Sequence, residues 1–471
     1  MFLNWRFLKP KARGIHLYNT KSKKKEMLKP LHSSHVSIYS CGPTVYAAAQ
    51  IGNLRSYVFA DTLHRALTNA EYKPKHIINI TDVGHLTDDA DQGEDKIEKA
   101  AKKEHRSAES ITKEYTKAFL ADLTTLNIVT GRYTFPKATD HIPEQIEIIE
   151  VLEEKGHTYK TKDGIYFDTK TFPKYGELGG INLVEQQGGA RTDMRDKKNP
   201  KDFALWKFSG KEKRLQEWDS PWGVGFPGWH LECSAMAISH LGEQIDIHTG
   251  GEDHIYTHHN NEIAQSEAAT GKVFASIWMH NAFLNLGGNK ISKSEGNSIY
   301  LADLIKEGFS PLSLRYLFLE AHYRTPLSFT KESLKGAENA LHRLYLFTDS
   351  LAKTKATFVH NFYLNRFKEA VYDDLNTAKA LSLLWQLVRD GDVSNGSKKK
   401  TLERMDRMLG LELFGKRLKV DIPQEIKVLA EKREEYRKQK DFKKSDELRD
   451  RIQEKGYSVL DRDNGFIIEK L

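Results

Sequence analysis

Apolar runs and amphipathic stretches alternate through the first 80 residues of the chain. A β-prone run at Val36–Ser40 (VSIYS) ends at the breaker Cys41-Gly42-Pro43, and a second run follows at 75–80 (KHIINI). Between the runs, apolar residues recur at i, i+4, i+7 and i+8, the spacing of one helix face: Phe59, Leu63, Ala66 and Leu67. The order strand, glycine-bearing loop, helix, strand predicts a βαβ unit whose loop and helix N-terminus can receive phosphate.

The alternation changes after residue 130. A helical pattern at 144–155 is followed by a hairpin-like run at 164–167 and a polar, glycine-rich stretch at 186–195. We interpret this part as an insertion, 131–225, that divides an α/β sheet domain into two halves. The expected halves are 15–130 and 226–300.

Most of the chain after residue 300 has a helical pattern. Residues 301–420 contain few glycines or prolines, so we expect a helical domain there. The last part, 421–471, begins with a highly charged helical pair and ends with a hairpin around Asn464-Gly465. Residues 1–14 form a basic N-terminal extension without the apolar core of a secretory signal.

The composition of the chain predicts a soluble protein of several domains. A chain of 471 residues with 39% hydrophobic and 29% charged residues predicts about three soluble domains. Its most apolar stretches are too short to cross a bilayer, so we expect no membrane association and a cytoplasmic location. The net charge of +7 suits a polyanionic partner, but an ordinary basic protein has the same balance.

The chain has only two cysteines, Cys41 and Cys233, which excludes a disulfide framework. They are either inert core residues or ligands and nucleophiles. In a helix at 257–268, His258 and Glu262 share one face and could bind a metal, although His254 and His258 have the same spacing. Two thiolates, an imidazole and a carboxylate would form a four-ligand site that zinc tolerates.

Three loops carry candidate nucleotide-binding residues. Lys290 and Lys293, in KISKS, can neutralise charge on a leaving pyrophosphate, although such a string also arises by chance in a lysine-rich chain. Gly52 permits close approach of a phosphate, and Gln50 and Asn53 can donate hydrogen bonds to it; a plain turn is the alternative.

The third loop, 250–253 (GGED), follows a β-prone run. A glycine pair with an acidic residue at a strand end suits a nucleotide ribose, which points to Gly251 and Asp253. The alternative is a turn in which Asp253 caps a helix.

The order of these motifs along the chain is more specific than any one of them. The series resembles the bacterial cysteinyl-tRNA synthetase family, a class I aminoacyl-tRNA synthetase family, from residue 15 to the C-terminus. The motifs are CGPTVY (41–46), QIGN (50–53), NITD (79–82), GWHLECSAM (228–236), GGEDH (250–254), THHNNEIAQSEA (257–268) and KISKSEGN (290–297).

The resemblance implies an α/β fold: a Rossmann-type class I catalytic domain with a connective insertion, an all-α anticodon-binding region and a small C-terminal domain. It implies one Zn²⁺ bound by Cys41, Cys233, His258 and Glu262. QIGN and KISKS occupy the places of the HIGH and KMSKS signatures of the family. The implied ATP-binding residues are Gly52, Gly251, Asp253 and Lys293. The implied cysteine-binding residues are Gly42, Thr44, Thr81 and Trp229.

One residue departs from the family pattern. Gln50 stands where the family usually has histidine, and a neutral amide can donate a hydrogen bond but cannot carry positive charge. We therefore expect the fold and substrate to be those of the family, while the catalytic rate is open.

The function that the resemblance implies has two steps. Cysteine and ATP, with Mg²⁺, give cysteinyl-adenylate, which then acylates tRNA(Cys); zinc selects the substrate thiolate, and we expect a monomer. Two alternatives share the resemblance: a ligase joining cysteine to an amino sugar, as in mycothiol synthesis, and a non-catalytic RNA-binding relative.

Overall fold

The computed structural model describes residues 14–83, 95–179, 197–210, 214–286, 289–290, 298–415, 423–462 and 465–470. The chain divides into two compact units, Met1–Phe414 and Gly415–Leu471. The first has two hydrophobic cores and the second has a core of its own. No helix in the described part of the chain is long and apolar enough to cross a membrane.

A parallel five-stranded sheet forms the centre of the first unit, in the order β11-β10-β3-β4-β5. Its strands are β3 (Val36–Ser40), β4 (Pro74–Ile78), β5 (Tyr133–Thr134), β10 (Ile245–Gly251) and β11 (Ala275–Asn281). The chain turns to one side of β3 for β4 and β5 and to the other side for β10 and β11. Ligands bind at such a switch point, beyond the carboxyl ends of the strands, and this order confirms the predicted Rossmann-type α/β fold.

Helix α1 (Ile51–Asn69) connects β3 to β4, as the apolar spacing predicts. It is buried on nearly all its faces rather than on one, and its buried residues include Arg55, Asp61 and Arg65. The reason is that α1 contacts the sheet as well as α8 (Pro311–Glu320) and α12 (Asn395–Leu409). A helix between two layers has no solvated face.

The insertion between the halves of the sheet is an antiparallel sheet in the order β6-β7-β8-β9, preceded by α4 (Ile142–Glu154). These strands are β6 (Thr158–Lys160), β7 (Gly164–Phe167), β8 (Phe203–Phe208) and β9 (Gly225–Pro227). The stretch assigned to the insertion also supplies β5 to the parallel sheet, since β5 pairs with β4. The glycine-rich stretch 186–195 lies outside the described residues.

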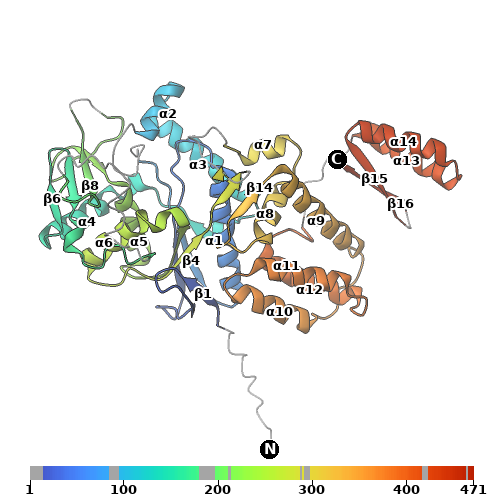
Figure 1. Cartoon of the computed structure of the whole chain (residues 1–471), viewed down its shortest axis with the longest axis horizontal. Helices are drawn as coiled ribbons and strands as arrows, with labels where there is room; N and C mark the ends of the chain where they lie inside the picture. Colours follow the sequence, from blue (N-terminus) through green and yellow to red (C-terminus); the bar gives the residue numbers. More distant parts are fainter. Residues whose placement is uncertain are drawn as a thin grey trace, which may run out of the picture. The chain divides into compact units, whose positions relative to one another are not determined.

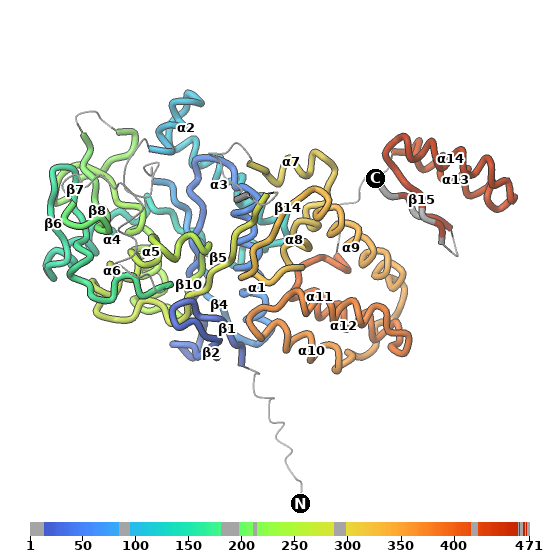
Figure 2. The backbone as a smooth tube through the Cα atoms, in the orientation of Figure 1, coloured from blue at the N-terminus to red at the C-terminus, as the bar shows by residue number. Residues whose placement is uncertain are grey.

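Helices dominate the second half of this unit, although β14 (Leu327–Phe329) interrupts them by pairing with β12 (Leu284–Leu286), which also pairs with β13 (Asn289–Lys290). In Figures 1 and 2 the insertion lies at one end of the unit and these helices at the other, with the parallel sheet between them. Besides α8 and α12, the helices are α7 (Leu301–Lys306), α9 (Lys331–Ser350), α10 (Asn361–Tyr372) and α11 (Thr377–Arg389).

Four further elements of the first unit lie nearer its N-terminus. They are the hairpin β1 (His16–Asn19) and β2 (Lys24–Met27), and the helices α2 (Lys96–Glu104) and α3 (Ala108–Thr125). The second unit has α13 (Gln424–Lys438), α14 (Phe442–Glu454), β15 (Tyr457–Arg462) and β16 (Gly465–Lys470).

Candidate active site

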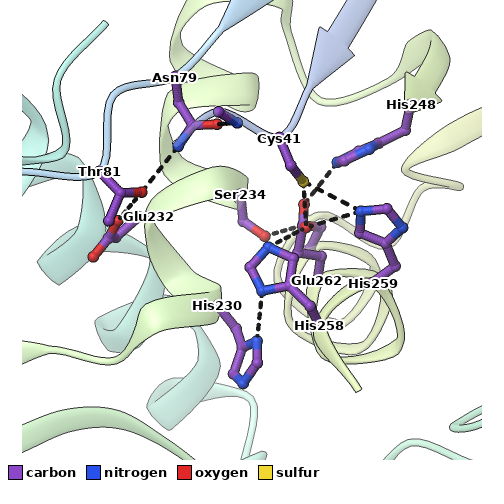
Figure 3. Close-up of polar contacts among 12 residues, drawn as sticks. Cys41, Asn79, Thr81, His230, Glu232, Ser234, His248, His258, His259 and Glu262 are labelled. Carbon is purple, nitrogen blue, oxygen red and sulfur yellow. Dashed lines mark hydrogen bonds and ion pairs between the residues drawn. The ribbon is translucent and has the colours of Figure 1, made fainter. Parts of the chain in front are cut away.

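The two cysteines meet at the switch point of the parallel sheet. Cys41 directly follows β3, and its N–H donates to the carbonyl of Thr249 in β10 at 3.1 Å. Cys233 is buried in the first half of α5 (Trp229–Leu241), a helix that begins after Gly228. The first turns of α6 (His258–Thr270) add His258 and Glu262, both buried. Residues more than 200 positions apart thus converge at one place (Figure 3).

The donor atoms of Cys41, Cys233, His258 and Glu262 all lie within 4.8 Å of one another. Within this group, His258 Nε2 is 2.9 Å from Glu262 Oε1, the i,i+4 contact that helical spacing allows. Two sulfurs, an imidazole nitrogen and a carboxylate oxygen at these distances are the donor types that bind zinc in proteins.

The four side chains share protons, and burial raises the pKa of the Cys41 thiol well above its ordinary value. The hydrogen bond from Cys41 lowers the pKa of Cys233 to about 6, although burial opposes this. Burial, which would lower the pKa of His258, is outweighed by Glu262 and Cys233, which raise it to about 10. The pKa of Glu262 is lowered because His248 and His258 outweigh burial. A divalent cation would displace the protons that this group shares.

A second layer of imidazoles surrounds the four donors. His248 Nε2 lies 2.8 Å from Glu262 Oε2, and His259 Nε2 lies 3.2 Å from the sulfur of Cys41. Cys41, His248, His259 and Glu262 also form a group with donor atoms within 4.8 Å, so the two groups share Cys41 and Glu262. His254, which helical spacing left open as a ligand, belongs to neither group. The sequence did not indicate His248 or His259, and the adjacent His258-His259 pair was the only available signal.

The expected cysteine-binding residues lie around these donors. The N–H of Gly42 donates to Asn79 Oδ1 at 2.7 Å, and a Cβ at Gly42 would be 1.5 Å from the Asn79 carbonyl oxygen, so only glycine fits. Thr44 and Thr81 pair through their backbones beyond the ends of β3 and β4. The ring of Trp229 is 4.6 Å from the ring of His258.

The expected nucleotide-binding residues are partly described. Gln50 precedes α1; its N–H donates to Asn53 Oδ1 at 3.2 Å, and its side-chain amide donates to Ser298 Oγ at 2.7 Å. The contact with Ser298 was not predicted. At Gly52 a Cβ would meet nothing closer than 3.9 Å, so packing within the chain does not require glycine there.

The other expected nucleotide-binding residues lie at the ends of strands in two different sheets. Gly251 is the last residue of β10, where a Cβ would come within 2.4 Å of Asp253 Oδ1, and Asp253 itself is exposed. Lys290 is the last residue of β13, but its side chain and the whole of Lys293 lie outside the described residues.

Solved structures confirm the class of fold. Methionyl-tRNA synthetase from Mycobacterium tuberculosis, bound to methionyl-adenylate, matches with a TM-score of 0.55 at 15% identity, covering 80% of this chain and 90% of that chain. A LeuRS from Agrobacterium radiobacter, in a ternary complex with tRNA, matches with a TM-score of 0.58 at 11% identity, covering 82% and 84%. The parallel sheet, its insertion and its helices have the fold of these class I aminoacyl-tRNA synthetases.

Sequence comparison gives the particular family. The model described as "tRNA synthetases class I (C) catalytic domain" matches 27–339, the DALR domain matches 366–414, and the "Cysteinyl-tRNA ligase anticodon binding domain" matches 419–466. Cysteine–tRNA ligase 1 of Burkholderia lata is 45% identical over 96% of both chains. The Treponema denticola cysteine–tRNA ligase is 43% identical over 95% of this chain and 98% of its own. The chain belongs to the cysteinyl-tRNA synthetase family.

Proposed function

We propose that this protein activates cysteine with ATP and transfers the cysteinyl group to the 3′ end of tRNA(Cys). The observation that carries the proposal is the convergence of two thiols, an imidazole and a carboxylate at the switch point of a class I catalytic domain. The two alternative functions are not favoured, because the chain matches the anticodon-binding domain of cysteinyl-tRNA ligases at 419–466.

In the first step the carboxylate of cysteine attacks the α-phosphorus of ATP, and pyrophosphate leaves. Gln50, Asn53, Lys290 and Lys293 stabilise the charge that develops on the phosphates, while Gly52, Gly251 and Asp253 bind the nucleotide, which carries Mg²⁺. In the second step the terminal adenosine of the tRNA attacks the adenylate, and AMP leaves.

Substrate choice is a selectivity problem, because cysteine and serine differ only by sulfur and oxygen. An apolar pocket discriminates between near-isosteres by only about 100-fold. Cys41, Cys233, His258 and Glu262 would hold a zinc ion, which would act as a Lewis acid that prefers a thiolate and would lower the pKa of the substrate thiol. Gly42, Thr44, Thr81 and Trp229 orient the rest of the amino acid.

The other regions serve the tRNA. We assign catalysis to 15–130 and 226–300, a connective role to 131–225, and tRNA binding to the helical region 301–420 and the C-terminal domain 421–471. Basic side chains of these regions would contact phosphates, which makes affinity depend on salt. We further propose that the protein acts as a cytoplasmic monomer; the extension 1–14 has no assigned role.

Two assays test the proposal directly. Cysteine-dependent ATP–pyrophosphate exchange should occur with the protein alone, and adding tRNA(Cys) should give cysteinyl-tRNA. Absence of exchange would contradict activation and favour a binding protein. Exchange without charging of tRNA, but with transfer to an amino sugar, would favour the ligase of the mycothiol type.

A further inference from the structure

A buried chain of hydrogen bonds lies beside the two thiols and ends at a carboxylate to which no role has been assigned. Gly42 N–H donates to Asn79 Oδ1 at 2.7 Å, Asn79 Nδ2 donates to Thr81 Oγ1 at 3.0 Å, and Thr81 Oγ1 donates to Glu232 Oε2 at 3.0 Å. Asn79, Thr81 and Glu232 are 1%, 2% and 0% exposed, so protein groups rather than bulk water determine this arrangement. Figure 3 shows the three side chains in line.

The direction of this chain follows from its first member. A backbone N–H can only donate, so the atom of Asn79 that faces Gly42 is the amide oxygen. The amide nitrogen of Asn79 therefore faces Thr81, and because that nitrogen is only a donor, the Thr81 oxygen must accept. Thr81 has a single proton, and in the structure its hydroxyl donates that proton to Glu232 Oε2 at 3.0 Å.

The Thr81 hydroxyl can therefore accept a hydrogen bond from a ligand but cannot donate one. A threonine oxygen has one O–H and two lone pairs; the proton is directed to Glu232 and one lone pair is occupied by Asn79. A ligand that meets Thr81 finds an acceptor only. An ammonium group is a donor only, and hydrogen bonds to charged groups are the stronger kind.

We propose that Asn79 and Glu232 are positioning residues that hold the Thr81 hydroxyl as an acceptor for the α-ammonium group of cysteine. This inference rests on the proposed function, since it takes cysteine as the substrate and Thr81 as part of its pocket. Glu232 is next to Cys233 in α5, so two consecutive residues of one helix act on different groups of the substrate. Cys233 is near the thiol, and Glu232 acts on the amino group through Thr81.

The test compares cysteine with 3-mercaptopropionate, which keeps the thiol and the carboxylate but lacks the amino group. Wild type is compared with Thr81→Val, Glu232→Leu, Asn79→Leu and the double variant Thr81→Val/Glu232→Leu. The KM for cysteine and for ATP is measured in pyrophosphate exchange, the inhibition constant of 3-mercaptopropionate against cysteine is determined, and zinc content is recorded.

We expect each single variant to raise the KM for cysteine by about 10- to 100-fold, because one charge-assisted hydrogen bond is lost. The inhibition constant of 3-mercaptopropionate and the KM for ATP should stay unchanged. The double variant should be no worse than Thr81→Val alone, since Glu232 acts through Thr81. Glu232→Gln, which keeps an acceptor oxygen, should recover most of the affinity.

Equal weakening of cysteine and 3-mercaptopropionate in all three single variants would overturn the positioning role, because a general disturbance of the pocket affects both ligands. Additive effects in the double variant would also overturn it. Because Glu232 and Asn79 lie at opposite sides of Thr81, either variant suffices if the other loses zinc. These outcomes concern the hydrogen-bond chain alone, whereas absence of cysteine-dependent exchange in the wild-type protein would overturn the proposed function itself.

Discussion

Glu262 is the residue on which the imidazoles of the site converge. Its Oε1 lies 2.9 Å from His258 Nε2 and its Oε2 lies 2.8 Å from His248 Nε2, and the side chain is fully buried. Both carboxylate oxygens are therefore held, which orients the carboxylate before any metal arrives. Removing a partner of this kind typically weakens metal binding by about 10- to 100-fold.

The contact between His248 and Glu262 leads to the first prediction. His248→Phe keeps the stacking against Trp278, whose ring is 4.5 Å from that of His248, but removes the hydrogen bond. We expect zinc affinity to fall by about 10- to 100-fold, measured by competition with a chelator. His141→Phe, at a histidine pair with His240 outside the site, is the control and should bind zinc normally. Wild-type affinity in His248→Phe would show that His248 does not orient the ligand.

The side chain of Gln50 leads to a second prediction. Its amide donates to Ser298 Oγ at 2.7 Å, next to the KISKSEGN segment, and a histidine ring could donate in the same way while adding positive charge near the phosphates. Gln50→His should therefore leave cysteine-dependent pyrophosphate exchange intact or raise it. A large loss of exchange would contradict this view of Gln50.

The sequence predicts the candidate metal ligands but not the residues that surround them. The family resemblance implied four zinc ligands, and the structure brings their donor atoms together. The choice between His254 and His258 could not be made from helical spacing, because it depends on where the helix begins: His254 lies in a 3₁₀ helix, Glu252–Ile255, and α6 begins only at His258. His248 was not named, since a buried strand residue shows no periodic signal that points to a partner in a later helix.

Asp61 joins elements that lie far apart in the chain. Arg65 Nε and Arg315 Nη2 each donate to Asp61 Oδ2 at 2.6 Å, and the Tyr133 hydroxyl donates to Oδ1 at 2.9 Å. Asp61 and Arg315 are fully buried, so the group ties α1 to α8 and β5 inside the protein. Removing the carboxylate would leave two buried guanidinium groups without their counter-charge.

We therefore predict that Asp61→Asn destabilises the first unit by about 3–5 kcal/mol, the usual cost of breaking a buried ion pair. Thermal unfolding of the two proteins under the same conditions measures the difference. Tyr133→Phe is the matched control, because it removes one hydrogen bond to the same carboxylate but leaves the charge in place, and it should cost about 1.5–3 kcal/mol. An Asp61→Asn protein no less stable than Tyr133→Phe would contradict the structural role of the charge.

The same residue predicts a pH dependence. Burial tends to raise the pKa of Asp61, but Arg315 and Arg65 outweigh it and lower the pKa to about 2. An aspartate in the unfolded chain has a pKa of about 3.9, so Asp61 takes up its proton at a lower pH in the folded state than in the unfolded state. The stabilisation is complete above about pH 4 and is lost between about pH 4 and pH 2. Asp61→Asn should remove this part of the acid dependence, and an unchanged acid profile would contradict it.

The sequence predicted α1 and its flanking strands because the periodicity of a helix and of a buried strand is local. It did not predict that α1 is enclosed on nearly all faces, since that depends on α8 and α12, more than 200 residues later. The strand β14 inside the helical region was missed for a similar reason. Three residues pairing with β12 carry too short a pattern to be read alone.

At the scale of the whole molecule, the last 57 residues form a unit of their own, Gly415–Leu471. Its core is made within α13, α14 and β15 by the buried residues Ile426, Leu429, Ala430, Leu448, Ile452 and Val459. The candidate metal ligands and the matched catalytic domain, 27–339, belong to the first unit, whereas the family's anticodon-binding domain matches 419–466.

Deleting residues 415–471 should therefore separate the two steps. We expect the truncated protein to show normal cysteine-dependent pyrophosphate exchange, because the sheet and the four donors are intact. Charging of tRNA(Cys) should show a higher KM for tRNA, since contacts to the anticodon are lost. Loss of exchange would contradict the independence of the first unit, and an unchanged KM for tRNA would contradict the role of the second.

Metal content and substrate choice, measured together, test the central claim most directly. Purified protein should hold one zinc per chain and support pyrophosphate exchange with cysteine but not with serine, and Cys233→Ser should lose zinc and cysteine activation together. A metal-free preparation that exchanges fully with cysteine would contradict the claim that a zinc ion, bound by Cys41, Cys233, His258 and Glu262, recognises the substrate sulfur.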